Sequence, residues 1–185
     1  MMRLRSTTSL TRQKEIGMKA GISKRLAVCA VLLGVSSASQ AAYATEFDET
    51  MGSIVTEYLK IQTSLAADST EGVAGAVKEI ESSAKQLDPA KADPAHLEHY
   101  KGIPESIIAA CAEFDDPEDI GSVRVAFQEL SKPVSMWVSM ARPEGKRVMY
   151  CSMKNAGWVQ QGSEVANPYY GAEMLRCGYE VGGGR

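Results

Sequence analysis

Histidine, cysteine and aromatic residues are scarce in this chain of 185 residues, which has two histidines, four cysteines and 6% aromatic residues. The sequence also lacks a Gly-x-Ser-x-Gly element, a phosphate-binding loop, a Cys-x-x-Cys pair and a His-Glu-x-x-His motif. These absences argue against an esterase-like hydrolase, a P-loop nucleotidase, a thioredoxin-like oxidoreductase and a zinc protease. Since no other catalytic arrangement is recognisable, we expect that the protein is not an enzyme.

Long hydrophobic runs are missing as well. The apolar run at residues 26–35 has ten residues, which is too short to cross a bilayer. Three basic residues precede it, and small residues after it end in Ala42-Tyr43-Ala44, which fits a signal-peptidase site. Residues 1–44 are therefore predicted to be a secretory signal peptide that is cleaved near Ala44, with Met18 as the expected true start. The cleaved protein is expected to work outside the cytoplasm and to have no membrane span.

Basic residues become few once this segment is removed. Residues 1–44 contain seven of the 20 Lys and Arg but only one of the 23 Asp and Glu, so 13 basic and 22 acidic residues remain, a net charge of −9. Such an acidic surface argues against nucleic acid or anionic lipid as the main partner. Cleavage also leaves an odd number of cysteines, namely Cys111, Cys151 and Cys177, so at least one thiol stays outside any intramolecular disulfide.

Apolar residues repeat every three or four positions in four segments, which predicts four amphipathic helices. These are residues 47–66, 71–87, 93–114 and a segment that follows Asp116-Pro117. Asp93 is predicted to be the N-cap of the third helix, and Pro104 is expected to kink or divide this helix near Gly102. Short connections favour antiparallel neighbours, so the predicted fold is all-α, a four-helix up-down bundle over residues 45–140. Residues 141–185 are predicted to form an irregular Cys/Met-containing tail, with a short extended piece at 147–151, packed on the bundle within the same domain.

Sulfur residues stand in pairs near both ends of this tail, Cys151 with Met153 and Met174 with Cys177. Thiolate and thioether are soft donors that favour Cu(I), and Ag(I) is expected to behave similarly. A Cys-x-Met pair on an extended strand points both sulfurs to one face, and a Met-x-x-Cys pair does so on a helical turn. The alternative is a Cys151–Cys177 disulfide with the methionines as core residues, which would stabilise the fold by roughly 3 kcal/mol.

The tail resembles a bacterial domain family of unknown function whose pattern reads Cys-Pro-Met, then Trp, then Asn-Pro-Tyr-Phe/Tyr-Gly, then Met-Leu-x-Cys-Gly. The matching residues are Cys151, Met153, Trp158, Asn167, Pro168, Tyr169, Tyr170, Gly171, Met174, Leu175, Cys177 and Gly178. Upstream, Tyr58-Leu59-Lys60 and the run of Arg124, Phe127, Leu130 and Ser131 also resemble the family. Ser152 departs from the pattern, because Pro is usual at its position.

This family occurs alone or as a C-terminal extension of periplasmic adaptor subunits in copper/silver efflux systems, so the resemblance implies a helical bundle that handles heavy metals. It favours a periplasmic protein that binds Cu(I) or Ag(I) through Cys151, Met153, Met174 and Cys177, for sequestration or for delivery to an efflux adaptor. The competing hypothesis is a disulfide-stapled envelope interaction module without metal. The two are compatible if the thiols form a disulfide when no metal is bound.

Three predictions concern residues outside the tail. His96 and His99 are three positions apart on a predicted helix, where they would form a second ligand pair, or else be solvated helix residues. Cys111 lies on an apolar stripe and is expected to be a buried small hydrophobic residue. Arg124 is expected to pair with an acidic residue across the bundle.

Overall fold

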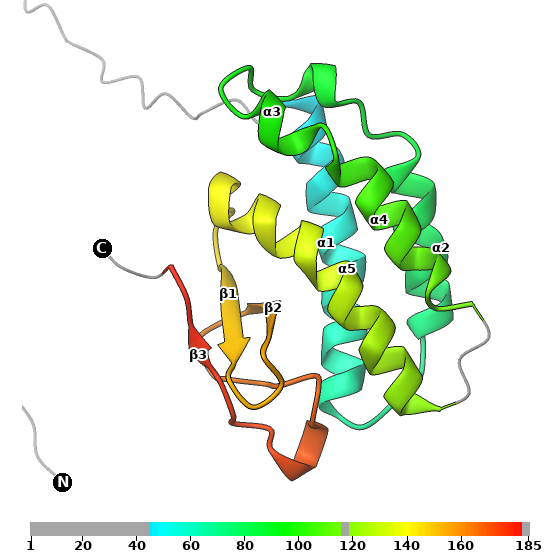
Figure 1. The fold of residues 1–185 in the computed structure, drawn as a ribbon, viewed down its shortest axis with the longest axis vertical. Helices are drawn as coiled ribbons and strands as arrows, with labels where there is room; N and C mark the ends of the chain where they lie inside the picture. The colour runs from blue at the N-terminus through cyan, green and yellow to red at the C-terminus, as the bar shows by residue number, and fades with distance from the viewer. Residues whose placement is uncertain (1–44, 116–118, 183–185) are drawn as a thin grey trace, which may run out of the picture. The chain divides into compact units, whose positions relative to one another are not determined.

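The computed structural model describes residues 45–115 and 119–182, so the predicted signal peptide lies outside the described residues. In this part of the chain, four helices of ten residues or more stand beside a three-stranded antiparallel sheet (Figure 1). The helices are α1 Glu46–Ala66, α2 Val73–Ala84, α4 Ile103–Ala112 and α5 Ile120–Ala141, with the short α3 Leu97–Tyr100 and the 3-10 turns η1 Pro89–Lys91 and η2 Gly171–Glu173. The strands are β1 Lys146–Cys151, β2 Ala156–Gln161 and β3 Tyr179–Glu180. The prediction of an all-α fold is therefore wrong.

Helices α1 and α5 begin at side-chain caps. Thr45 Oγ1 accepts a hydrogen bond from the N–H of Asp48 at 3.1 Å, and Asp48 Oδ2 accepts one from the N–H of Thr45 at 3.2 Å. At the start of α5, Asp119 Oδ1 accepts a hydrogen bond from the N–H of Ser122 at 2.8 Å. The apolar stripes behind these caps are buried, as the sequence predicts. In the described part of the chain no helix combines the length and apolar composition that a membrane crossing needs.

The third predicted helix is divided at the expected place but begins later than expected. α3 ends at Tyr100 and α4 begins at Ile103, with Pro104 in the first turn of α4, where a missing N–H costs no helical hydrogen bond. The division near Gly102 is therefore confirmed. Asp93 does not cap a helix: its Oδ1 accepts a hydrogen bond from the N–H of Ala95 at 2.8 Å and so closes a turn, and the first helical residue is Leu97.

The sheet has the strand order β2-β1-β3, with β1 in the centre. β1 and β2 form a hairpin in which Met149 lies opposite Trp158 and Cys151 lies opposite Ala156. The extended piece predicted at 147–151 is confirmed as β1. Its partners β2 and β3 were not predicted, because neither has a hydrophobic pattern that indicates a strand. Gln160 of β2 is buried, and its Oε1 is satisfied by hydrogen bonds from Trp158 Nε1 and from the N–H of Ala166, both at 3.1 Å.

Polar groups of α1 hold the sheet and the following segment on the helices. The Tyr58 hydroxyl accepts a hydrogen bond from the N–H of Val159 at 3.1 Å and lies 2.7 Å from Ser131 Oγ. Gln62 Nε2 donates a hydrogen bond to the carbonyl of Ala166 at 2.7 Å. These bonds satisfy backbone groups that would otherwise be buried without partners. Strand β2 and the helices therefore share one hydrophobic core.

Candidate functional site

Cys151 and Cys177 lie side by side although 26 residues separate them in the sequence. Their sulfur atoms are 3.4 Å apart and both thiols are free. A disulfide would bring the sulfurs to about 2.05 Å, so this contact is non-bonded. Cys151 is the last residue of β1 and its exposed fraction is 0%, whereas Cys177 is partly exposed. The structure thus joins two sulfurs that stand at opposite ends of the tail.

The pairing of β3 with β1 brings the two cysteines together (Figure 1). Tyr150 of β1 pairs with Tyr179 of β3, so the residues just before Tyr179 pass the end of β1. Gly178 makes this passage possible. Its φ of 146° lies in a region that favours glycine, and a Cβ there would be 2.5 Å from Trp158 Cη2. Any side chain at position 178 would therefore displace the indole ring or the segment that carries Cys177.

Asn167 connects both cysteines to the rest of the segment. Its side chain is buried, and Nδ2 donates a hydrogen bond to the carbonyl of Cys177 at 2.6 Å. Its Oδ1 accepts a hydrogen bond from the N–H of Tyr169 at 2.8 Å, and its own N–H donates to the carbonyl of Leu175 at 2.9 Å. The side chain also helps to lower the pKa of the Cys151 thiol. Sequence reasoning found Asn167 only as part of a motif, because its partners lie on other segments.

The surroundings of the pair favour a thiolate on Cys151 and a thiol on Cys177. Burial raises the pKa of Cys151, but hydrogen bonds from the N–H of Lys154, from Cys177, from Asn167 and from the N–H of Met153 lower it below its ordinary value. The pKa of Cys177 is raised, first because its thiol donates to Cys151, and then by burial and by the negative charge on Cys151. A metal binds the thiolate, so a lowered pKa favours Cys151 over Cys177 as a metal ligand.

The two methionines are close to the cysteines along the chain, but not in the predicted local geometry. Strand β1 ends at Cys151 and residues 152–155 form a turn, so Met153 does not share the strand face of Cys151; its side chain is 66% exposed. Met174 follows η2 rather than lying on an α-helical turn, and its carbonyl accepts a hydrogen bond from the N–H of Cys177 at 2.9 Å. The role of both methionines as thioether ligands stays a prediction.

The two histidines lie elsewhere. His96 precedes α3 and its ring is 5.5 Å from the ring of Tyr100, while His99 lies within α3. α3 lies at the top of the fold in Figure 1, and β1 points away from it toward Cys151, its last residue. Within residues 45–115 and 119–182, no three His, Cys, Asp or Glu side chains gather in a group that could hold a metal ion. The structure therefore does not bring the histidines to the sulfur pair.

Arg124 and Asp68 fix the segment between Asn167 and Cys177 to the helices. Arg124 Nη2 is 2.6 Å from Asp68 Oδ1, and Arg124 Nε donates a hydrogen bond to the carbonyl of Pro168 at 2.9 Å. Asp68 Oδ2 accepts a hydrogen bond from the N–H of Ala172 at 2.8 Å. A Cβ on Gly171 would lie 1.9 Å from Asp68 Oδ1, so this contact needs glycine. The predicted ion pair of Arg124 with an acidic residue is confirmed, and its partner is Asp68.

Cys111 takes no part in the site. It is buried on α4, where burial, with a smaller contribution from Glu81, raises the pKa of its thiol to about 12. The prediction of a buried small hydrophobic residue is confirmed. A thiol of this kind is protonated at neutral pH and is a poor metal ligand.

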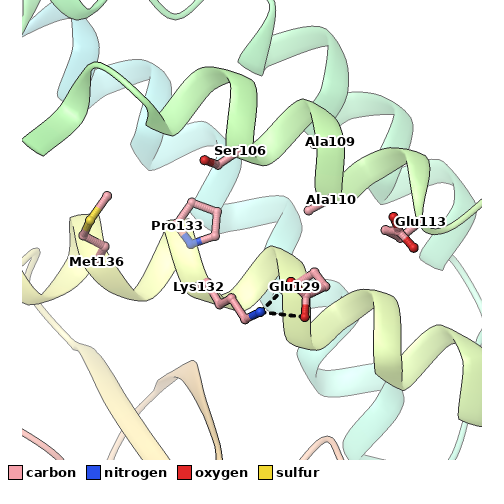
Figure 2. A pocket seen from close by; sticks show the side chains of 8 residues that line it. All are labelled: Ser106, Ala109, Ala110, Glu113, Glu129, Lys132, Pro133 and Met136. Carbon is pink, nitrogen blue, oxygen red and sulfur yellow. Dashed lines mark hydrogen bonds and ion pairs between the residues drawn. The ribbon is translucent and has the colours of Figure 1, made fainter.

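A second feature of the surface is a hollow of about 430 Å³ between α4 and α5. Figure 2 shows Ser106 of α4 across from Pro133 of α5 and Ala110 further along α4, with the ion pair of Glu129 and Lys132 on the α5 side. Its lining has no thiol, histidine or aromatic ring. The hollow therefore offers no chemistry related to the sulfur pair.

Residues 54–145 match the model of a family described as "Protein of unknown function (DUF3347)". Comparison with curated proteins and with solved structures gave no match. The family match supports the assignment of the helical part of the chain to a domain family of unknown function. It ends before Cys151, so it covers neither cysteine of the pair.

Proposed function

We propose that this protein is a periplasmic metal-binding protein that holds a soft monovalent ion, Cu(I) or Ag(I), between Cys151 and Cys177. The observation that carries the proposal is the 3.4 Å approach of two free thiols from distant parts of the chain. Met153 and Met174 are the proposed supporting thioether ligands. The protein would sequester the ion or pass it to a periplasmic efflux adaptor.

The donor set favours a soft ion over a harder one. Structural zinc sites usually have four ligands from Cys, His, Asp and Glu, and no group of even three such side chains occurs in the described part of the chain. Thiolate and thioether select Cu(I), which is stable with few sulfur ligands. Two thiols with two nearby methionines therefore suit Cu(I) better than Zn²⁺.

Hydrogen-bond donors at Cys151 support binding. A metal binds the thiolate, and two thiolates that share one monovalent ion leave the site with a net negative charge. The N–H groups of Lys154 and Met153 and the amide of Asn167 point positive dipoles at this sulfur. These donors would stabilise the charge of the loaded site.

The exposure of the site suits exchange of the ion between proteins. Cys151 is buried, Cys177 is partly exposed and the Met153 side chain is 66% exposed. An ion that arrives from solvent would meet Met153 and Cys177 before Cys151. Sulfur ligands exchange readily on Cu(I), so a partner protein could remove the ion by the same route.

The proposed periplasmic location and the proposed efflux-adaptor partner are supported by the sequence alone. The proposed signal peptide at residues 1–44 would deliver the protein to the periplasm, with cleavage near Ala44. The resemblance of the tail to extensions of copper/silver efflux adaptors supports an adaptor as the receiving protein. The molecular mass of the protein recovered from the periplasm tests the cleavage directly.

Anaerobic titration with Cu(I) against a competing chelator tests the proposal, using the full chain with Cys29→Ser so that only the cysteines of the described region take part. We expect one ion per chain, and a loss of affinity of at least about tenfold in Cys151→Ser and in Cys177→Ser. Cys111→Ala is the matched cysteine control and should bind as the parent does. Met153→Leu should weaken Cu(I) binding. Met136 is an exposed methionine on α5, so Met136→Leu is the control and should leave binding unchanged.

Two results would contradict the proposal. One is a reduced protein that cannot compete with the chelator, and the other is binding that survives in both cysteine variants. Either result, with a disulfide that resists reduction, would favour the disulfide-stapled interaction module. If only the Met153→Leu prediction failed, so that this variant bound Cu(I) as tightly as the parent, Met153 would not be a ligand and the two thiols alone would form the site.

A further inference from the structure

The two sulfurs of the pair differ in what can reach them from solvent. Cys151 has an exposed fraction of 0% and lies at the end of the central strand. Cys177 is partly exposed and precedes the edge strand β3. A molecule too large to enter the core can therefore touch Cys177 but not Cys151.

We infer that Cys177 is a thiol-modification site at which small disulfides, such as oxidised glutathione or cystine, form a mixed disulfide that Cys151 then resolves. The inference rests on the 3.4 Å contact between the sulfurs and on their different exposure. It concerns the two cysteines of the proposed metal site, but it does not require a metal ion.

The reaction has two balanced steps. In the first, the sulfur of Cys177 attacks one sulfur of RS–SR; the RS–SR bond breaks, a Cys177–SR bond forms, and the proton of Cys177 leaves with RSH. In the second, the thiolate of Cys151 attacks the sulfur of Cys177; the Cys177–SR bond breaks, a Cys151–Cys177 bond forms, and RS⁻ leaves and takes up a proton from solvent to give a second RSH. The protein thiols are oxidised to one disulfide and the small disulfide is reduced to two thiols.

The geometry favours the second step over release of a stable adduct. The attacking sulfur of Cys151 already lies 3.4 Å from its target, and a disulfide bond needs about 2.05 Å, so a small displacement completes the bond. Cys111 is buried on α4, which packs against α2 and α5 rather than on the sheet, so it does not compete for the adduct. Cys151 is thus the only described cysteine placed to resolve it.

The protein disulfide would also have a consequence for metal binding, and this consequence rests on the proposed function. Oxidation removes both thiolate ligands at once, so the oxidised protein should not retain Cu(I). The reduced protein should regain the site when a thiol reductant reverses the two steps.

The test uses metal-free full-length chain with Cys29→Ser, treated with oxidised glutathione and analysed by peptide mass mapping. In the parent we expect a Cys151–Cys177 disulfide and two molecules of reduced glutathione per chain. In Cys151→Ser a stable glutathione adduct should accumulate on Cys177. In Cys177→Ser the adduct on Cys151 should form at least about tenfold more slowly, because local opening must precede it.

Equal rates of adduct formation at the two sulfurs, or a parent protein that stops at the mixed disulfide, would overturn the inference. Cys151→Ala repeats the trapping experiment in case serine disturbs the buried position, and a brief reaction of the parent should show the transient adduct on Cys177. Urea unfolding midpoints show whether each variant is folded. Because no metal is added, this result is independent of the Cu(I) titration.

Discussion

The Asn167 side chain donates a hydrogen bond to the carbonyl of Cys177 at 2.6 Å, and its amide also helps to lower the pKa of the Cys151 thiol. One buried amide therefore holds the backbone of Cys177 and influences the thiol of Cys151. Asn167 positions the pair together with the pairing of β1 and β3.

Replacement of Asn167 by Asp should weaken both the fold and the site. The variant keeps the shape and the acceptor for the N–H of Tyr169 but loses both N–H donors, and it places a carboxylate beside Cys151. We expect a loss of about 1–3 kcal/mol in the free energy of unfolding, together with weaker Cu(I) binding. Urea unfolding and chelator competition measure the two effects.

The matched control is Asn155→Asp in the exposed turn between β1 and β2. Asn155 Oδ1 accepts a hydrogen bond from the Tyr150 hydroxyl, and Asp keeps an acceptor there. Asn155→Asp should lower the free energy of unfolding much less than Asn167→Asp does. Equal effects of the two substitutions would mean that added charge, rather than the lost donors, is responsible.

Tyr58→Phe should destabilise the protein by about 1–3 kcal/mol, because it leaves the buried N–H of Val159 without its acceptor. It also removes the hydroxyl partner of Ser131. Tyr100→Phe provides a comparison, since Tyr100 is buried as well and its ring stacks on Phe47 at 5.1 Å. Urea denaturation measures both variants, and a smaller loss in Tyr58→Phe than in Tyr100→Phe would contradict this account of how the sheet is held on α1.

Much of the helical part could be predicted from local sequence. The apolar spacing of α1 and α5 and the effect of Pro104 depend on residues near one another, so the pattern contains the information. The predicted start of the third helix at residue 93 is wrong, because an Asp-Pro pair is compatible with a turn as well as with a helix cap. Here Asp93 closes the turn.

Strands β2 and β3 could not be predicted from the sequence, for a different reason. β2 pairs with β1 and packs on α1 and α5, and Gln160 of β2 finds hydrogen-bond partners that no strand pattern contains. β3 has two residues and no pattern of its own. The same limit applies to the site: the sequence suggests which sulfurs matter, but their distance depends on the β1–β3 pairing and on the fit of Gly178 against Trp158.

Cys111 should resist alkylation in the folded protein. Burial raises the pKa of its thiol to about 12, so the reactive thiolate is scarce at pH 8. Iodoacetamide at pH 8, followed by mass mapping, should label Cys177 before Cys111. Labelling of Cys111 should appear in urea, once the chain unfolds. Rapid native labelling of Cys111 would contradict its position in the helical core.

Asp68 should make the stability of the protein depend on pH in the acid range. Hydrogen bonds from the N–H of Ala172 and from Arg124 lower the pKa of its carboxyl in the folded state. A lowered folded-state pKa means that the carboxylate stabilises the fold above the unfolded-state pKa, about 3.9, and that this stabilisation is lost as the pH falls through the lower folded-state value. Asp68→Asn should therefore lower the urea midpoint at pH 6, and the difference from the parent should shrink as the pH falls below about 4.

Glu57→Gln is the control for this pH dependence, because it removes the ion pair with Lys60 within one turn of α1 and should change the midpoint little at any pH. Asp68 differs from Glu57 in joining three segments, since its carboxylate also holds Arg124 and the N–H of Ala172. If the Asp68→Asn difference stays constant down to pH 2, the carboxylate charge contributes nothing. The segment before Cys177 would then be held by the remaining bonds of Arg124 and Asn167.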